Sequence, residues 1–207
     1  MKKNLLILGA AVLLAAGAQA QTSYGLKAGV NLGKYSNVDK ASNNTSFYVT
    51  GFADLPMSSQ FSIQPGISLQ GKGAKFESSY SEVASADVTR NVMSIEVPVN
   101  AVYYIPAGSG NVFLGAGPYI GFNISGKDKA KGNIGDASAE IKNDLKFSGD
   151  NKNMNLIDAG ANFMGGYKFA NGLLVNAGYN LGLTQLVPKA ADKVSNRVWS
   201  FGVGFQF

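Results

Sequence analysis

Apolar residues alternate with polar residues or glycine through most of this chain. In 61–70 the odd positions read Phe, Ile, Pro, Ile and Leu, whereas the even positions carry only Ser, Gln or Gly. The last segment, 197–207, repeats the pattern from Trp199 to Phe207. A period of two residues is the period of a β-strand. Beyond residue 20 no apolar run approaches the roughly 20 residues that a membrane-spanning helix needs, so the pattern predicts an all-β chain.

Six more segments share this alternation. The eight expected strands are 23–34, 46–55, 61–70, 92–105, 111–124, 155–169, 173–183 and 197–207. In 46–55 the parity stays open, because Phe47, Val49 and Leu55 compete with Tyr48 and Phe52 for the apolar face.

The connections between these strands alternate in length. Short turns are expected at 56–60, 106–110 and 170–172, and long polar loops at 35–45, 71–91, 125–154 and 184–196. Outer-membrane barrels have this asymmetry, with short periplasmic turns and longer extracellular loops. The pattern predicts an eight-stranded antiparallel up-and-down transmembrane β-barrel.

The two faces of the strands decide which side meets lipid. A soluble, lipocalin-like barrel around an apolar ligand is the alternative, but eight strands enclose too little space for so many large side chains. The opposite face, rich in Gly, Asn and Ser, fits a narrow interior, and aromatic residues near strand ends fit the membrane interfaces. The aromatic members of the apolar face are Tyr24, Phe61, Tyr103, Phe122, Tyr167, Phe169, Tyr179, Trp199, Phe205 and Phe207.

Residues 1–20 have the three parts of a secretory signal peptide. Lys2 and Lys3 precede an apolar stretch, and 18–20 read Ala-Gln-Ala, a small-x-small cleavage site. We expect cleavage after Ala20, a barrel domain over 21–207, and export to the bacterial outer membrane. No cysteine follows that could carry a lipid anchor.

Composition excludes most familiar catalytic chemistry. The chain has no histidine and no cysteine, so it can form neither a Ser-His-Asp triad nor a thiolate site. Removing Lys2 and Lys3 from the 18 basic residues leaves 16 against 13 acidic ones, a balance too weak to indicate nucleic-acid binding. We expect no enzyme activity, no catalytic residue, no cofactor and no resident metal.

Four charged residues are expected to form a charge network in the barrel lumen. They are Lys27, Glu96, Asp158 and Lys168, with Asp54 a further candidate. Charges in a narrow lumen must be paired or hydrated. A salt-bridge network that plugs the barrel and a polar conduction path are both open interpretations.

Several short motifs, taken in order, resemble the porin-like or PorT-like outer-membrane β-barrel family of the Bacteroidota. The resemblance spans the mature chain and implies a Gram-negative outer-membrane protein, without establishing a pore. Gly66 stands where such families commonly carry an acidic residue. The motifs lie at 24–31 (YGLKAGVN), 61–65 (FSIQP), 94–98 (SIEVP), 115–119 (GAGPY), 179–183 (YNLGL) and Phe207.

The end of the chain has a second interpretation. The alternation that ends on Phe207 resembles the signal read by the barrel-assembly machinery, although lipid packing also explains it. The residues of this signal are Phe201, Val203, Phe205 and Phe207.

The long loops are where an extracellular partner would bind, since loops on a rigid scaffold carry function. We therefore expect a structural or surface-interaction role, with a narrow passive channel for ions or small polar solutes as the alternative. Leu145 and Phe147 are candidate anchors of a loop contact. Weak calcium binding is a minor alternative, because lysines are interleaved with its candidate ligands. Those ligands are Asp128, Asp136, Glu140, Asp144 and Asp150.

Overall fold

The computed structural model describes residues 22–38, 41–81, 84–134, 137–188, 190 and 192–207. The expected signal peptide, 1–20, lies outside the described residues. Within them, no helix is long and apolar enough to cross a membrane.

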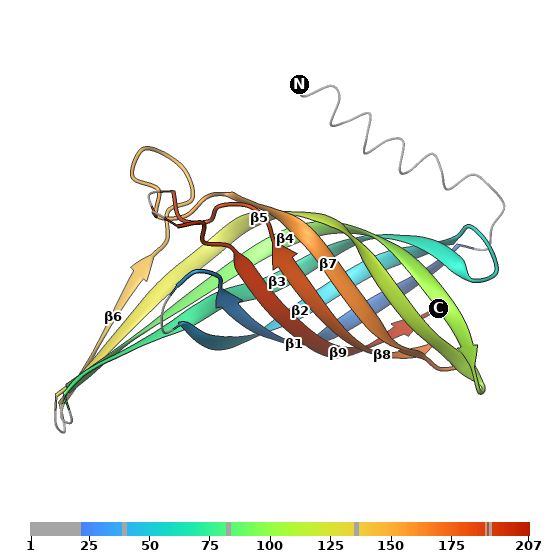
Figure 1. Cartoon of the computed structure of the whole chain (residues 1–207), viewed down its shortest axis with the longest axis horizontal. Coiled ribbons are helices and arrows are strands. Elements are labelled where there is room, and N and C mark those ends of the chain that lie inside the picture. The colour runs from blue at the N-terminus through green and yellow to red at the C-terminus, as the bar shows by residue number, and fades with distance from the viewer. Residues whose placement is uncertain (1–21, 39–40, 82–83, 135–136, 189, 191) are drawn as a thin grey trace.

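Eight antiparallel strands close into a barrel (Figure 1). The first strand pairs with both the second and the last, and this pairing closes the ring. The predicted fold class is thereby confirmed. The strands of the structure are β1 (Ser23–Tyr35), β2 (Ala41–Pro56), β3 (Phe61–Ser81), β4 (Ala84–Ala107), β5 (Gly110–Ile134), β6 (Ala137–Asp144), β7 (Ile157–Lys168), β8 (Leu173–Gly182) and β9 (Asn196–Gln206).

A ninth strand, β6, lies outside the ring and, among the described strands, pairs with β5 alone. Together with the ends of β3, β4 and β5 it forms a four-stranded sheet that extends well beyond the barrel, at the lower left of Figure 1. We call residues 74–91 and 127–144 the projecting sheet.

The projecting sheet corrects two sequence predictions. Segments 71–91 and 125–154 were expected to be loops, but most of 71–91 and the part of 125–154 up to Asp144 are largely strand. The expected apolar face is missing there because a strand beyond the membrane has no lipid to contact. Alternation persists in weaker form, for example at 87–92, where Val88 and Val92 alternate with polar residues.

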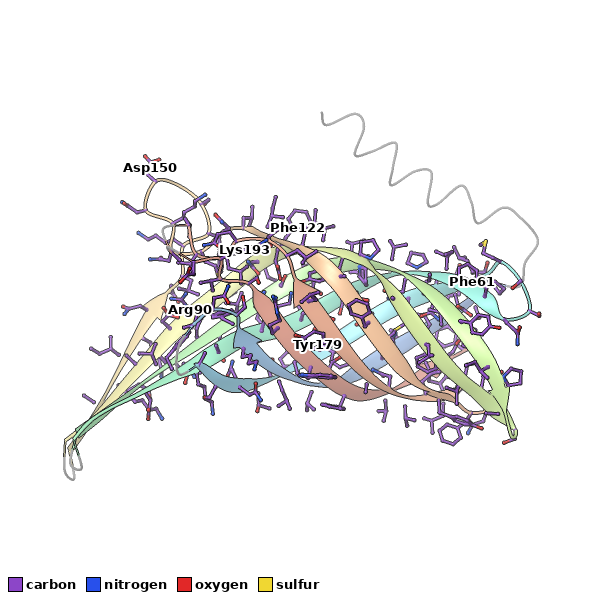
Figure 2. The ribbon with its side chains drawn as sticks, viewed as in Figure 1. Phe61, Arg90, Phe122, Asp150, Tyr179 and Lys193 are labelled. Atoms are coloured by element: carbon purple, nitrogen blue, oxygen red, sulfur yellow. The ribbon has the colours of Figure 1, made fainter. Side chains whose placement is uncertain are left out.

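The apolar face of the barrel strands points outward. Tyr24, Phe163, Trp199 and Phe207 are each exposed over 47% to 69% of their surface, and Figure 2 shows the outer face covered with such side chains, Phe122 and Phe61 lying toward opposite ends. The interior is lined mostly by Asn, Ser, Gln and charged residues. An apolar exterior around a polar interior contradicts the lipocalin-like alternative.

The structure also settles the parity of β2. Phe47 and Val49 are exposed on the outer face, whereas Tyr48 and Phe52 are 4% and 7% exposed and lie inside the barrel. Asp54 shares the inward parity, so this candidate does belong to the lumen.

Candidate functional site

Buried apolar side chains gather near both ends of the lumen. At the end with the short turns, four residues from four strands form a buried cluster, which we call the turn-side cluster. Its members are Phe52, Val102, Phe113 and Leu174. At the other end, strand ends and the segments that follow β6 and β8 form the mouth cluster. Its buried members are Tyr35, Ala74, Val92, Leu145, Met154, Leu186 and Val194.

Between these clusters lies a buried ion cluster. The Lys72 ammonium on β3 forms salt bridges with Glu96 on β4 and with Asp158 on β7, the latter at 2.6 Å. The three side chains are at most 1% exposed. A buried charge requires a close partner, because its transfer out of water is costly. One cation here satisfies two carboxylates that lie in register on either side of β5, because Glu96 and Asp158 both lie opposite Gly121.

Asp158 is the centre of the hydrogen-bond network. Its Oδ2 accepts hydrogen bonds from Asn196 at 2.7 Å and Tyr119 at 3.3 Å, and its Oδ1 accepts one from Thr184 at 3.1 Å. With Lys72 and Glu96, the network joins β3, β4, β5, β7 and β9. It therefore ties together five of the eight barrel strands across the lumen.

The predicted charge network is brought together only in part. Glu96 and Asp158 meet at Lys72, but Lys27 and Lys168 lie elsewhere in the lumen. Lys27 lies over the Phe52 ring, 4.6 Å from its centroid, and Lys168 lies 5.2 Å from the centroid of Tyr104.

Asp54 is held by neutral donors. Gln64 donates a hydrogen bond to its Oδ1 and Gln206 to its Oδ2, each at 3.0 Å. Among the described residues no salt bridge reaches Asp54 or Lys27; the Lys27 ammonium donates a weak hydrogen bond to the Met164 sulfur at 3.5 Å. The ion cluster and the Asp54 site are therefore separate.

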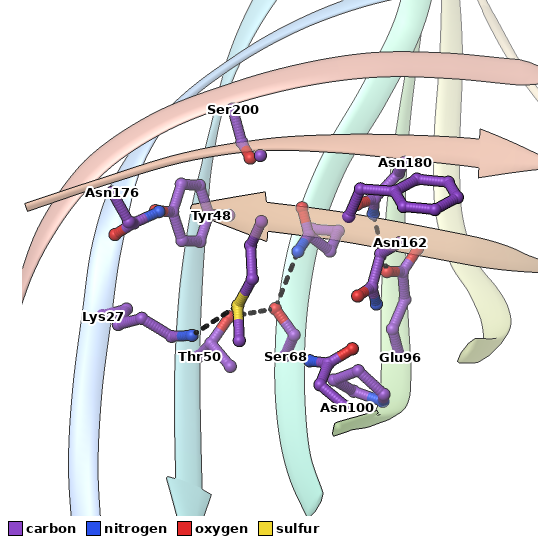
Figure 3. A pocket seen from close by; sticks show the side chains of 15 residues that line it. Lys27, Tyr48, Thr50, Ser68, Glu96, Asn100, Asn162, Asn176, Asn180 and Ser200 are labelled. Atoms are coloured by element: carbon purple, nitrogen blue, oxygen red, sulfur yellow. Dashed lines mark hydrogen bonds between the residues drawn. The ribbon is translucent and has the colours of Figure 1, made fainter. Parts of the chain in front are cut away.

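A small polar cavity lies beside Lys27 (Figure 3). Its volume is about 60 Å³, enough for a few water molecules at roughly 10–15 Å³ each. Thr50, Ser68, Asn100 and Asn176 contribute to its polar lining. The cavity lies in the region between the two apolar clusters.

Sequence reasoning missed Lys72, the cation at the centre of the cluster. Its segment was expected to begin a loop at residue 71, whereas β3 continues to Ser81. The signal was present, because Ser68 and Gln70 face the lumen and Lys72 has the same parity. Extending the strand by one more pair of residues would have placed it inside.

The mouth cluster corrects the hypothesis about Leu145 and Phe147. Leu145 is 9% exposed, and Phe147 packs against the same cluster. A Cβ atom at Gly126 would lie 2.8 Å from Leu145 and 2.9 Å from Phe147, so both residues pack tightly against β5. They anchor the segment onto the barrel and are not presented to a partner.

The acidic residues of the projecting sheet are mostly paired with basic ones. Arg90 binds Asp128 through two hydrogen bonds of 2.6 and 2.7 Å, and Lys142 lies 2.9 Å from Glu140. The hydrogen bond from Lys142 lowers the pKa of Glu140. Asp144 lies 4.0 Å from Lys127. Asp136, another of the calcium candidates, lies outside the described residues, and the described part of the chain contains no acidic cluster that could hold a metal ion.

The fold and the lumen define a membrane-spanning β-barrel with a polar interior and an apolar cluster near each end. The family of outer membrane protein beta-barrel domains matches residues 18–187. The chain belongs to this family, and its location is the outer membrane.

Solved structures with similar folds share little sequence with this chain. The attachment invasion locus protein Ail of Yersinia pestis is 13% identical with a TM-score of 0.43, and the match covers 91% of this chain and all of Ail. Neisserial surface protein A is 15% identical with a TM-score of 0.48, at the same coverage. The N-terminal barrel domain of Pseudomonas aeruginosa OprF is 12% identical with a TM-score of 0.37, covering 90% and 100%. No curated protein matches the sequence significantly.

Proposed function

We propose that this protein is a non-conducting, non-enzymatic outer-membrane barrel that acts at the cell surface through its projecting sheet. The observation that carries the proposal is the difference between the filled lumen of the barrel and the sheet that extends beyond it. The lumen holds two apolar clusters and a buried ion cluster, whereas β3, β4 and β5 continue past the barrel and are joined there by β6, which lies outside the ring.

The outer edge of β6 supports this role. β6 pairs with β5 from Ala137 to Asp144 and with no other described strand. Its second edge therefore carries backbone N–H and C=O groups without a strand partner. Such an edge can bind an extended segment of another protein by strand addition. The proposed extracellular partner is a protein with an exposed extended segment.

Shortening the two hairpins tests the role without altering the barrel. Glu77 lies opposite Asp87, and Lys129 opposite Lys142, so 78–86 and 130–141 can each be replaced by a tight turn that keeps Phe76 against the mouth cluster. We expect cells displaying the native protein to adhere to a coating of mucin or of fibronectin, and cells displaying the shortened variant to lose that adhesion. Equal adhesion of the two cell types on every coating would refute the role.

The passive channel is the second candidate, and the polar cavity beside Lys27 is the observation in its favour. A solute would still have to cross a layer containing Val102, Phe113 and Leu174, which are at most 4% exposed, and the mouth cluster. Eight-stranded barrels usually have interiors filled by side chains. Conduction would require both clusters to open.

The remaining proposals concern origin and biogenesis. We propose that residues 1–20 are removed as a signal peptide, that 21–207 form the mature barrel in a Gram-negative outer membrane, and that its porin-like kinship lies within the Bacteroidota. The support is the small-x-small site at 18–20 and the ordered motifs. The barrel-assembly machinery, reading Phe201, Val203, Phe205 and Phe207, and outer-membrane lipid are the proposed general partners, and nucleic acid is not one.

A further inference from the structure

Two cations lie opposite each other at the edge of the lipid-facing surface that is farther from the short turns. Lys34 on β1 lies directly opposite Arg197 on β9. Both have the outward parity of their strands. Leu32 lies two residues from Lys34 and Trp199 two residues from Arg197, each on the same face, and Leu32 and Trp199 are themselves paired. Like charges directly opposite each other on a sheet destabilise it. A bound anion would therefore stabilise this pair by neutralising the repulsion between its two positive charges.

The described residues place no carboxylate in a salt bridge with this pair. No salt bridge within the described residues involves Lys34 or Arg197. Arg197 is positioned by hydrogen bonds from its Nη1 to the Gly182 and Asn196 carbonyl oxygens, both at 2.8 Å, and to Ser195 Oγ at 2.9 Å. Within the described residues its Nε and Nη2 donate no hydrogen bond, so these donors remain available for a ligand.

The position of the pair relative to the membrane identifies the ligand. Trp199 and Phe207, at the two ends of the outward row, are separated by eight residue steps. At about 3.3 Å per residue and a tilt of roughly 40°, that is about 20 Å along the barrel axis, close to the apolar band of about 25 Å in such proteins. The pair one step beyond Trp199 therefore lies at headgroup level on the extracellular side.

The residues just below the pair fit the interface. The rings of Tyr179 and Trp199 pack with their centroids 4.8 Å apart, and Leu181 lies opposite Arg197. Aromatic rings at this depth mark the boundary between acyl chains and headgroups. An Arg binds phosphate well because its planar guanidinium donates two parallel hydrogen bonds, and a Lys adds a point charge.

We propose that Lys34 and Arg197 bind the phosphate group of an anionic lipid in the outer leaflet, with its acyl chains against Leu32, Leu181 and Trp199. The proposal is independent of any role for the projecting sheet, since it depends only on the position of the barrel in the membrane. The site couples β1 and β9, the two strands that close the ring.

Trp199 reports directly on this site, because it is the single tryptophan of the chain. The folded protein, purified from outer membranes and reconstituted, is compared in bilayers containing 10 mol% of either phosphatidate or phosphatidylcholine, each brominated near the headgroup. We expect brominated phosphatidate to quench Trp199 fluorescence several-fold more strongly than brominated phosphatidylcholine does. This difference is the size of effect that one or two charge-assisted hydrogen bonds to the headgroup would produce. Equal quenching by the two lipids would overturn the proposal.

Variants separate this site from general charge attraction. We expect Lys34→Gln to reduce the preference for phosphatidate and Lys34→Gln with Arg197→Gln to abolish it. The matched control is Lys129→Gln with Lys142→Gln, which removes the same charge from an opposed pair on the projecting sheet, and it should keep the native preference. Within the described residues the Lys34 side chain makes no hydrogen bond or salt bridge. The single Lys34 variant therefore tests the site without disturbing the hydrogen bonds of Arg197.

Inorganic phosphate distinguishes a lipid headgroup from a free anion. We expect millimolar phosphate, at constant ionic strength, to leave the quenching by brominated phosphatidate unchanged, because the acyl chains contribute to binding. Displacement of the lipid by inorganic phosphate would overturn the assignment to lipid. Retention of the full preference in the double variant would overturn the assignment to Lys34 and Arg197.

Discussion

Lys72 and Asp158 are 86 residues apart in the chain, and the Lys72 ammonium lies 2.6 Å from the Asp158 carboxylate inside the barrel. Glu96 forms the second salt bridge of the same ammonium. Since both carboxylates and the cation are buried, neither can exchange its partner for water without opening the lumen. The ion cluster thus acts as a structural crosslink between strands that are not neighbours in the ring.

Replacing the shared cation should destabilise the barrel. Lys72→Met leaves Glu96 and Asp158 buried without their cation, and breaking a buried ion pair from one side costs about 3–5 kcal/mol. We expect a large fall in the urea midpoint of the folded protein in vesicles, monitored by the heat-dependent gel shift. The matched variant Lys131→Met breaks only the exposed pair with Glu140, and its midpoint should equal that of the native protein. Equal midpoints for all three proteins would refute the crosslink.

Ring closure depends on a pair of opposed glycines. Gly29 on β1 faces Gly202 on β9, and a Cβ atom at Gly29 would lie 2.6 Å from the Gly202 Cα. Gly29→Ala should therefore cost about 1–3 kcal/mol by overpacking, seen as a lower unfolding midpoint. Gly132→Ala is the control, because a Cβ atom there has no neighbour within 4 Å. A native midpoint for the Gly29 variant would mean that the two strands separate readily at this position.

The mouth cluster should hold the segment 184–195 over the barrel. Leu186 is 0% exposed, and truncating a buried leucine costs about 2–5 kcal/mol. We expect Leu186→Ala to make the segment sensitive to added protease on intact cells. Ile141→Ala, which removes a side chain that is 61% exposed on the projecting sheet, should leave the cleavage pattern of 184–195 unchanged. Protection of this segment in both variants would show that the cluster does not anchor it.

Substitution of the terminal Phe207 distinguishes recognition by the assembly machinery in the cell from folding of the barrel in lipid. Phe207→Ala should lower the amount of folded protein in the outer membrane several-fold if the assembly machinery reads this residue, while refolding of the purified variant into vesicles stays near normal. Val203→Ala truncates a lipid-facing side chain of the same row, 58% exposed, and controls for lost lipid contact. Equal effects of the two variants in cells would leave lipid packing as the whole explanation of the alternation.

The barrel strands could be predicted from the sequence because lipid imposes a strict alternation on them. The outward row from Trp199 to Phe207 is unambiguous for this reason. Where strands leave the membrane the constraint ends, so β6 and the far halves of β3, β4 and β5 resembled polar loops. The parity of β2 was ambiguous because the lumen accepts Tyr48 and Phe52 beside small residues.

The pairing of lumen charges could not be predicted, because it depends on register and on the shape of the closed ring. Glu96 and Asp158 were both identified as inward charges, yet the cation that joins them lies on β3, beyond the expected end of that strand. Lys27 and Lys168 share the inward parity but lie at other heights, against aromatic rings. Parity determines which residues enter the lumen, and three-dimensional closure determines which of them meet.

Conductance in a planar lipid bilayer tests the closed lumen most directly. The folded protein is purified from outer membranes, and its heat-dependent gel shift confirms an intact barrel before insertion. Our account predicts no stable unitary current steps, because the turn-side cluster and the mouth cluster interrupt the polar path on either side of the Lys72 ion cluster. Stable unitary steps whose size changes on Lys27→Gln would contradict it and identify the lumen as a conducting pathway.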